Sequence, residues 1–116
     1  MAGPTEENQV TPSSGNVYAD LGFPDAEEML GKAKLVRAIG HTIREKKLTQ
    51  SAAAKLMGID QPKVSQLLSG QFRGYSSDRL MQFLTLLGQD VVIFIAPKSA
   101  KDEGPGHLSI SLSHGL

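Results

Sequence analysis

The sequence contains no cysteine and no tryptophan, and aromatic residues make up only 5% of its 116 positions. The lack of cysteine excludes disulfide bonds, thiolate-bound zinc or iron–sulfur centres and cysteine nucleophiles. With only four Phe and two Tyr, the core has to be built from aliphatic side chains, methionine and alanine, which suits packed helices better than a β-sandwich. The fold is therefore expected to depend on packing alone.

Long apolar runs are also missing. The longest, residues 91–97, is far shorter than the roughly 20 residues that a membrane-spanning helix needs. The first eight residues carry Glu6 and Glu7 instead of the basic start of a signal peptide. The sequence therefore predicts a cytoplasmic protein without a membrane partner.

Twelve basic and twelve acidic residues cancel in the whole chain but are unevenly distributed. Residues 1–30 hold six acidic residues and no Lys or Arg, a charge of −6, whereas residues 31–99 hold eleven basic and four acidic residues, a charge of +7. Residues 100–116 add −1. The basic middle segment favours a polyanionic partner, although a soluble helical domain with an ordinary charged surface would also account for it.

Composition divides the chain into three parts. Residues 1–15 are rich in Pro, Ser and Gly and too poor in apolar side chains to order themselves, which predicts a disordered lead. Residues 16–97 form the expected domain, and residues 98–116 a flexible tail. At the start of the domain, Val17, Tyr18, Leu21 and Phe23 predict a short irregular segment that pins onto the domain or contacts a partner.

Hydrophobic periodicity and capping residues predict an all-α domain of four to five helices. The expected helices span about residues 25–47, 49–58, 61–69 and 77–88. Asp25, Thr49 and Ser77 are the expected N-caps, and Pro62 fits the first turn of the third helix. The side chains expected to face the core from the fourth helix are Leu80, Met81, Phe83, Leu84, Leu86 and Leu87.

Residues 91–96 are β-branched or apolar and lie between Asp90 and Pro97, which predicts a short C-terminal β-strand. A lone strand is unstable in water, so pairing with the same strand of a second subunit is the economical solution. This predicts a homodimer held by Val91, Val92, Ile93, Phe94 and Ile95. The alternative is pairing within the chain, with the alternating Leu108, Ile110 and Leu112 of the tail.

The second and third expected helices have the side-chain sizes of a helix-turn-helix. The positions that matter for packing carry small or apolar residues, namely Ala54, Gly58, Ile59, Val64 and Leu67. A small residue at position 54 allows a close helix crossing, and glycine at position 58 allows a left-handed turn. The outward side of the third helix is left polar, as in a helix that enters the major groove.

A set of residues in this region matches a known pattern: Leu48, Thr49, Gln50, Ala53, Ala54, Gly58, Ile59, Gln61, Val64, Ser65, Leu67 and Gly70. In these residues the sequence resembles the helix-turn-helix of Cro/lambda-repressor-type (XRE) transcription regulators. Residues 17–28 and 90–97 extend the resemblance to small XRE proteins of the HigA antitoxin type, so that it covers about residues 16–97. The resemblance implies a lambda-repressor-like fold and a homodimer that binds an inverted-repeat operator in double-stranded DNA. It also implies repression of the protein's own operon, often beside a RelE/HigB-like toxin that cleaves messenger RNA.

The resemblance assigns roles to polar residues of this region. Gln61 is expected to read a base directly, because its amide can donate to and accept from adenine, and Gln50 to bind a phosphate or brace Gln61. Lys63, Ser65 and Gln66 share the exposed face of the third helix and suit bases or the backbone. The residues expected to hold the DNA backbone are Lys55, Gln71 and Arg73. Asp60 is expected to cap the third helix.

An enzymatic function has little support in the sequence. His41, His107 and His114 lack metal-ligand spacing, and no nucleophile elbow or glycine-rich phosphate loop accompanies them. We therefore expect no catalysis, no metal and no cofactor. The alternative to a DNA-reading regulator is an interaction module on the same scaffold, which would neutralise a RelE/HigB-like toxin through its acidic start and the apolar residues 17–23 without reading DNA.

Overall fold

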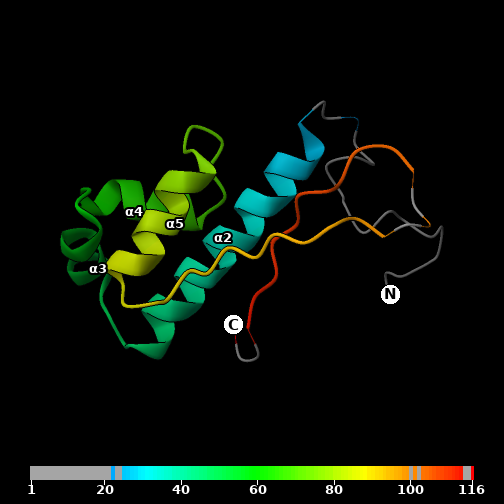
Figure 1. The fold of residues 1–116 in the computed structure, drawn as a ribbon. Coiled ribbons are helices and arrows are strands. Elements are labelled where there is room, and N and C mark those ends of the chain that lie inside the picture. Colours follow the sequence, from blue (N-terminus) through cyan, green and yellow to red (C-terminus); the bar gives the residue numbers. More distant parts are fainter. Residues whose placement is uncertain (1–21, 23–24, 100, 102, 114–115) are drawn as a thin grey trace, which may run out of the picture. The chain divides into compact units, whose positions relative to one another are not determined.

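The computed structural model describes residues 22, 25–99, 101, 103–113 and 116. This part of the chain contains the helices α2 (Ala26–Glu45), α3 (Gln50–Met57), α4 (Gln61–Leu68) and α5 (Ser77–Leu86), and no strand (Figure 1). The predicted all-α architecture is confirmed for these residues. The predicted disordered lead at residues 1–15 and the apolar residues 17, 18, 21 and 23 lie outside the described residues.

The chain divides into two compact units, Met1–Leu30 and Gly31–Leu116, which meet within α2. The described part of the first unit is mainly the first turn of α2, where the Met29 amide donates to the Asp25 carbonyl oxygen at 2.9 Å. Glu27 and Glu28 lie in this turn, where acidic side chains favour the positive end of the helix dipole. The helix-turn-helix and all the contacts described below belong to the second unit.

The core of the second unit consists mainly of aliphatic side chains, together with Met57 and the two phenylalanines Phe72 and Phe83. The largest fully buried side chains are Phe83, Ile39, Met57, Leu67, Leu80, Leu87, Val64 and Thr42. Phe83 of α5 packs edge-on against Tyr75, with ring centroids 5.7 Å apart, and the Arg79 guanidinium lies 4.5 Å from the Phe83 ring centre. The prediction that Leu86 faces the core is wrong, since 43% of it is exposed, whereas Leu87, which was also predicted to face the core, is 2% exposed directly after α5.

The helix ends follow local capping chemistry with one difference from expectation. Ser76, not Ser77, caps α5, because the Ser76 hydroxyl accepts from the Arg79 amide at 3.0 Å while Ser77 is already helical. Helix α2 ends two residues before a left-handed Lys47, which has a φ of 55°. The Leu48 amide closes this end by donating to the Ile43 carbonyl at 3.0 Å.

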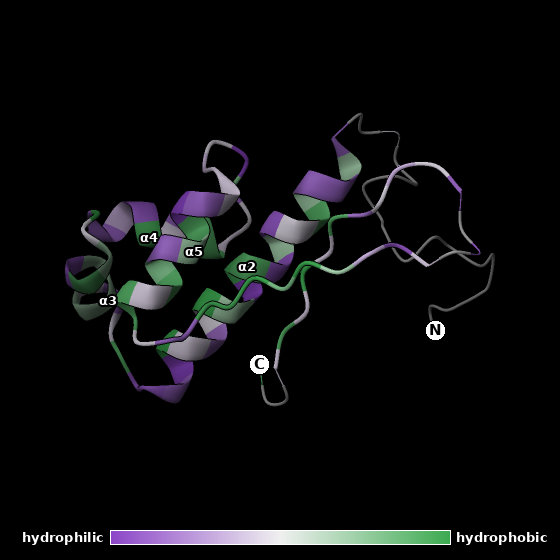
Figure 2. Cartoon of the chain, viewed as in Figure 1, coloured by the Kyte–Doolittle hydropathy of each residue, from purple (hydrophilic) through white to green (hydrophobic). Residues whose placement is uncertain are grey.

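Residues 91–97, the extended segment, leave the end of α5 without regular secondary structure (Figure 1). Figure 2 shows the apolar character of this segment, and Val92, Phe94 and Ile95 are each at least 85% exposed. Pairing between subunits needs a second chain, so the predicted strand and homodimer stay predictions. No ladder joins the extended segment to Leu108, Ile110 and Leu112 in the part of the chain that the structure describes.

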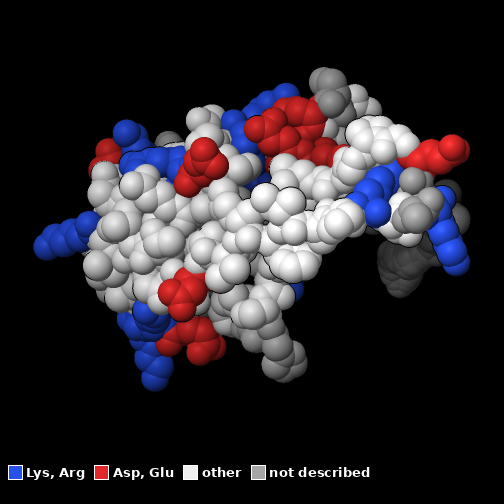
Figure 3. Space-filling model, viewed as in Figure 1, with Lys and Arg blue, Asp and Glu red and all other residues white. Residues whose placement is uncertain are grey.

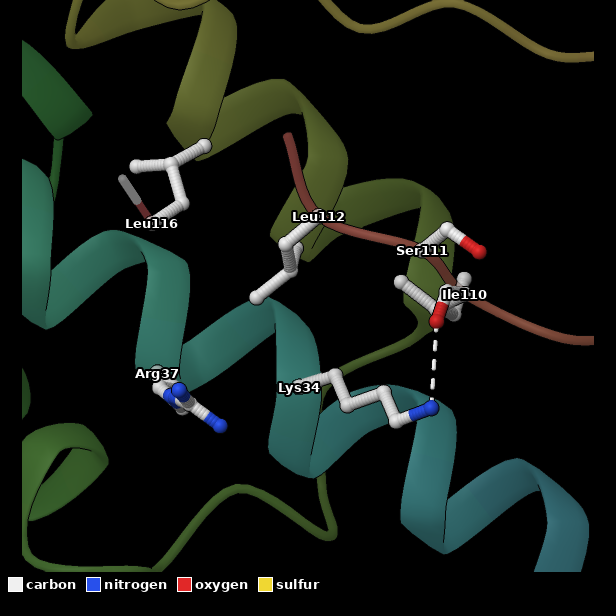
Figure 4. A pocket seen from close by; sticks show the side chains of 6 residues that line it. All are labelled: Lys34, Arg37, Ile110, Ser111, Leu112 and Leu116. Carbon is white, nitrogen blue, oxygen red and sulfur yellow. Dashed lines mark hydrogen bonds between the residues drawn. The ribbon is translucent and has the colours of Figure 1, made fainter. Parts of the chain in front are cut away.

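Part of the tail lies against α2. The Lys34 ammonium donates to the Ile110 carbonyl at 3.1 Å, and the Ile110 side chain lies 3.2 Å from the place where a Cβ on Gly31 would be. Between helix and tail is a shallow pocket of about 390 Å³ (Figure 4), whose lining residues are Lys34, Arg37, Ile110, Ser111, Leu112 and Leu116. Glycine at position 31 therefore allows the tail to approach the helix closely.

Among the described residues, none of the helices is both long enough and apolar enough to cross a membrane.

Candidate nucleic-acid interface

Helices α3 and α4 are each started by a capping side chain. The Thr49 hydroxyl accepts from the Ala52 amide at 3.0 Å, and the Asp60 carboxylate accepts from the Lys63 amide at the same distance. Each such cap contributes about 1 kcal/mol to helix stability. Both predicted caps are confirmed, and the role of Asp60 explains an acidic residue at the start of an otherwise uncharged or basic helix face.

Gly58 makes the turn between the two helices. Its φ of 75° is left-handed, and its amide donates to the Ala54 carbonyl at 2.8 Å. A Cβ at this position would meet no atom within 4 Å, so glycine is needed for the backbone conformation and not for space. The turn lets α3 and α4 pack together, with Ala54, Val64 and Leu67 buried and Ile59 half-buried.

The opposite face of α4 is polar and open to solvent. Gln61, Lys63, Ser65 and Gln66 are all exposed. Figure 3 shows Lys and Arg side chains beside the α3 and α4 end of the helical part, and a broad uncharged area over α5 and the extended segment. The structure thus brings the predicted readout residues together on one accessible helix face.

Gln61 is held by Gln50, although both side chains are near the surface. The Gln61 Nε2 donates to the Gln50 Oε1 at 2.7 Å, which corresponds to the bracing alternative for Gln50. A primary amide has two hydrogens and one acceptor oxygen. The bond to Gln50 therefore leaves Gln61 with one donor hydrogen and its carbonyl oxygen, the pair that adenine requires.

The residues predicted to contact the DNA backbone lie on two different parts of the fold. Lys55 is exposed on α3, and Gln71 and Arg73 are exposed in the loop between α4 and α5. The Gln71 backbone amide donates to the Gln66 backbone carbonyl at 3.0 Å, so the loop starts directly from the end of α4. The positions of the three side chains are compatible with phosphate contacts beside the face of α4.

Lys32 is a residue of this region that the sequence interpretation missed. It is 7% exposed on α2, and its ammonium donates to the Arg73 carbonyl at 3.3 Å. The spacing indicates the burial of Lys32 but not its partner, because Lys32, Val36 and Ile39 recur at the intervals of one helix face, and all three are buried. Lys32 therefore connects α2 to the loop that carries Arg73.

The site offers polar and basic groups rather than metal ligands. Within the residues that the structure describes, no group of three or more His, Asp or Glu side chains is placed to hold a metal ion. The chemistry available on α4 and its neighbouring loop is hydrogen bonding by amides and hydroxyls, together with the positive charges of Lys55, Lys63 and Arg73.

Comparison with known proteins places this arrangement in a family. A family model described as "Helix-turn-helix domain" matches residues 17–96. A solved structure called "Putative XRE Family Transcriptional Regulator" is 40% identical, with a TM-score of 0.69, and the match covers 78% of this chain and 100% of that one. No curated protein matches the sequence. By its helix-turn-helix geometry and these two similarities, the chain belongs to the XRE-type helix-turn-helix regulators.

Proposed function

We propose that the chain is a sequence-specific DNA-binding transcription regulator without catalytic activity, which represses its own operon. It reads a palindromic operator as a homodimer, with α4 in the major groove. Gln61 contacts a base, Lys63, Ser65 and Gln66 contact base edges or backbone, and Lys55, Gln71 and Arg73 hold phosphates. Gln50 orients Gln61.

The observation that carries this proposal is the hydrogen bond of 2.7 Å from Gln61 to Gln50 at the exposed start of α4. A surface glutamine without a function usually keeps its rotamer freedom, because fixing it costs about 1 to 2 kcal/mol of entropy. Fixing it before DNA arrives lowers the entropy lost on binding. The family membership of the chain supports the same interpretation.

The homodimer is proposed from the extended segment. Val92, Ile93, Phe94 and Ile95 are 72–90% exposed, which is unfavourable for a monomer in water. Antiparallel pairing with a second copy would satisfy the backbone groups of both segments and cover part of this apolar surface. The two α4 helices of such a dimer would engage half-sites about 34 Å apart.

We further infer that the chain acts as the antitoxin of a RelE/HigB-like toxin. Residues 1–30 carry a charge of −6, which complements a basic ribonuclease, and Val17, Tyr18 and Leu21 would add apolar contacts. If the chain served only as such an interaction module, it would show no preference among DNA sequences. Substitution of Val17, Tyr18 or Leu21 would then impair function more than substitution of Gln61.

Fluorescence anisotropy tests the regulator proposal. The purified protein is titrated against DNA from directly upstream of its own gene and against a shuffled duplex, each at several salt concentrations. We expect a preference of about a thousandfold or more with a steep salt dependence. Equal and weak affinities for the two duplexes would contradict specific readout and favour the interaction module.

A further inference from the structure

The junction between α5 and the extended segment has a defined geometry. Gly88 is left-handed, with a φ of 96°. Its amide donates to the Thr85 carbonyl at 3.0 Å, and the Gln89 amide donates to the Leu84 carbonyl at 2.9 Å. This pair of bonds is a Schellman motif, which ends a helix and fixes the direction of the next residues.

A side-chain hydrogen bond then ties the junction to α2. The Gln89 Nε2 donates to the Thr42 Oγ1 at 3.0 Å, and the Thr42 hydroxyl donates to the Ala38 carbonyl at 2.7 Å. Thr42 is fully buried, with 0% exposure. A buried hydroxyl that both accepts and donates in this way is restricted to one orientation.

Lys46, directly after the end of α2, lies close to the same junction. Its ammonium lies so close to Gly88 that a Cβ at position 88 would clash with it. A cation beside the last turn of a helix interacts favourably with the helix dipole, and α5 has no basic residue of its own in that turn. Thr42 and Lys46 thus act on two consecutive residues, Gln89 and Gly88.

The exposure of the chain changes directly after this junction. Gln89 and Val91 are half-buried, whereas Val92 is 85% exposed. Gln89 is therefore the last residue before the extended segment whose side chain is bonded to the helical domain. We propose that Thr42 and Gln89 are positioning residues, which fix the direction of the extended segment and thereby set the separation of the two α4 helices in the dimer.

The inference rests on the proposed homodimer, and a small angular change would be enough to matter. With half-sites about 34 Å apart, each recognition helix lies about 17 Å from the two-fold axis. A rotation of each domain by about 10° about a point near the two-fold axis, where the paired segments would meet, would move its helix by about 3 Å, close to the rise of one base pair. The orientation of the junction therefore bears on which half-site spacing the dimer accepts.

Pulsed electron paramagnetic resonance tests the inference on the full chain without DNA. Because the sequence has no cysteine, the exposed Ser69→Cys at the end of α4 accepts a single spin label on each protomer. The distance distribution between the two labels is then measured in three backgrounds: otherwise unchanged, with Thr42→Val, and with Gln89→Ala. Thr85→Val is the matched control, since the Thr85 hydroxyl donates to the Gln82 carbonyl within its own helix.

We expect a narrow distribution in the unchanged protein and in Thr85→Val. In Thr42→Val and Gln89→Ala we expect a distribution about twice as wide, or a maximum shifted by more than about 3 Å. Circular dichroism should give the same helix content for all four proteins, so that a change in distance reports position and not unfolding. If Thr42→Val unfolds, the Gln89→Ala variant alone tests the positioning role, because truncating the half-buried Gln89 side chain leaves the buried core unchanged.

Two outcomes would overturn the inference, and they can be told apart. Unchanged distributions in both Thr42→Val and Gln89→Ala would overturn the positioning role and leave the dimer intact. The absence of any distance between labels in the unchanged protein would mean that no dimer forms. That outcome would overturn the dimer part of the proposed function and the positioning role with it.

Discussion

At the scale of single residues, the start of α4 combines a fixed amide with free hydrogen-bonding capacity. Gln61 uses one amide hydrogen on Gln50 and keeps one donor and one acceptor in the same plane. Asp60, directly before it, is occupied by the Lys63 amide. The negative charge next to the proposed DNA face thus serves the helix end.

Gln61→Ala should weaken binding to the upstream operator by roughly 1 to 3 kcal/mol and change binding to the shuffled duplex little. The reason is that a lost base contact affects only the sequence that carries the base. Anisotropy titrations of both duplexes measure the two effects. Equal losses on the two duplexes would assign Gln61 to the backbone instead.

Lys63→Ala and Arg73→Ala should each weaken binding to both duplexes and lower the slope of log affinity against log salt by about one. The slope counts the counterions released when a cation reaches a phosphate. Lys101→Ala, an exposed cation in the tail, is the control and should leave the slope unchanged. A slope that stays constant in Lys63→Ala or Arg73→Ala removes that residue from the phosphate contacts.

The residues of the interface could be predicted from the sequence to the extent that their chemistry is local. The outward face of α4 and the caps Thr49 and Asp60 follow from spacing within one or two turns. The bond from Lys32 to the Arg73 carbonyl joins residues 41 positions apart, and no local pattern contains it. The same holds for Gln89 and Thr42, which are 47 positions apart.

At the scale of the elements, the ends of two helices are followed by a residue with left-handed backbone, which is glycine in one case and lysine in the other. Gly58 ends α3 with a φ of 75°, and Lys47 follows α2 with a φ of 55°. A side chain in the left-handed region costs about 1 kcal/mol compared with glycine. The end of α3 has the favourable residue, and the end of α2 does not.

Lys47→Gly should therefore stabilise the protein, and Gly58→Ala should destabilise it, each by about 1 kcal/mol. Gly58→Ala would introduce no clash, since a Cβ there has open space, so its cost reports the backbone alone. The control is Gly74→Ala, which also has open space and no positive φ. Urea denaturation measures the free energy of unfolding of the three variants. A Lys47→Gly variant that is less stable than the unchanged protein, or a Gly58→Ala variant that is more stable, would contradict this prediction.

The extents of the helices were predictable because caps and stops are encoded close to the ends they define. Ser76 and Ser77 offer the same hydroxyl one residue apart, and in the structure Ser76 is the cap. Leu86 and Leu87 likewise have the same hydropathy, and in the structure only Leu87 is buried in the core. Where two neighbouring residues are of the same type, the local sequence does not determine which of them caps the helix or faces the core.

At the scale of the whole molecule, the extended segment is an apolar stretch that the described fold of one chain leaves uncovered. The strand propensity of residues 91–96 is clear from the sequence, but a ladder needs a partner for its backbone groups. The described part of the single chain contains helices alone. The predicted strand at residues 91–96 would form only by pairing with a second copy, so the contacts within one chain do not determine it.

Ile93→Asp should convert the proposed dimer into a monomer, because pairing would bury an unpaired carboxylate or place it against apolar neighbours. Sedimentation velocity at micromolar concentration gives the two masses. Leu108→Asp is the matched control, since both side chains are 72% exposed and only Ile93 lies in the extended segment. A dimer that persists in Ile93→Asp, or is lost in Leu108→Asp, would contradict pairing through this segment.

The residues that flank the extended segment have a consequence for protein solubility. Exposed apolar segments of this length tend to stack in register into fibrils. In a parallel stack every copy would place its Asp90 beside the Asp90 of the next, and the repeated like charges oppose growth. In an antiparallel pair centred on Phe94, Asp90 lies instead opposite Lys98 of the partner subunit, and Pro97 interrupts hydrogen bonding near the end. The flanking charges thus disfavour a parallel stack relative to the proposed antiparallel pair, which lowers the tendency of an exposed apolar segment to aggregate.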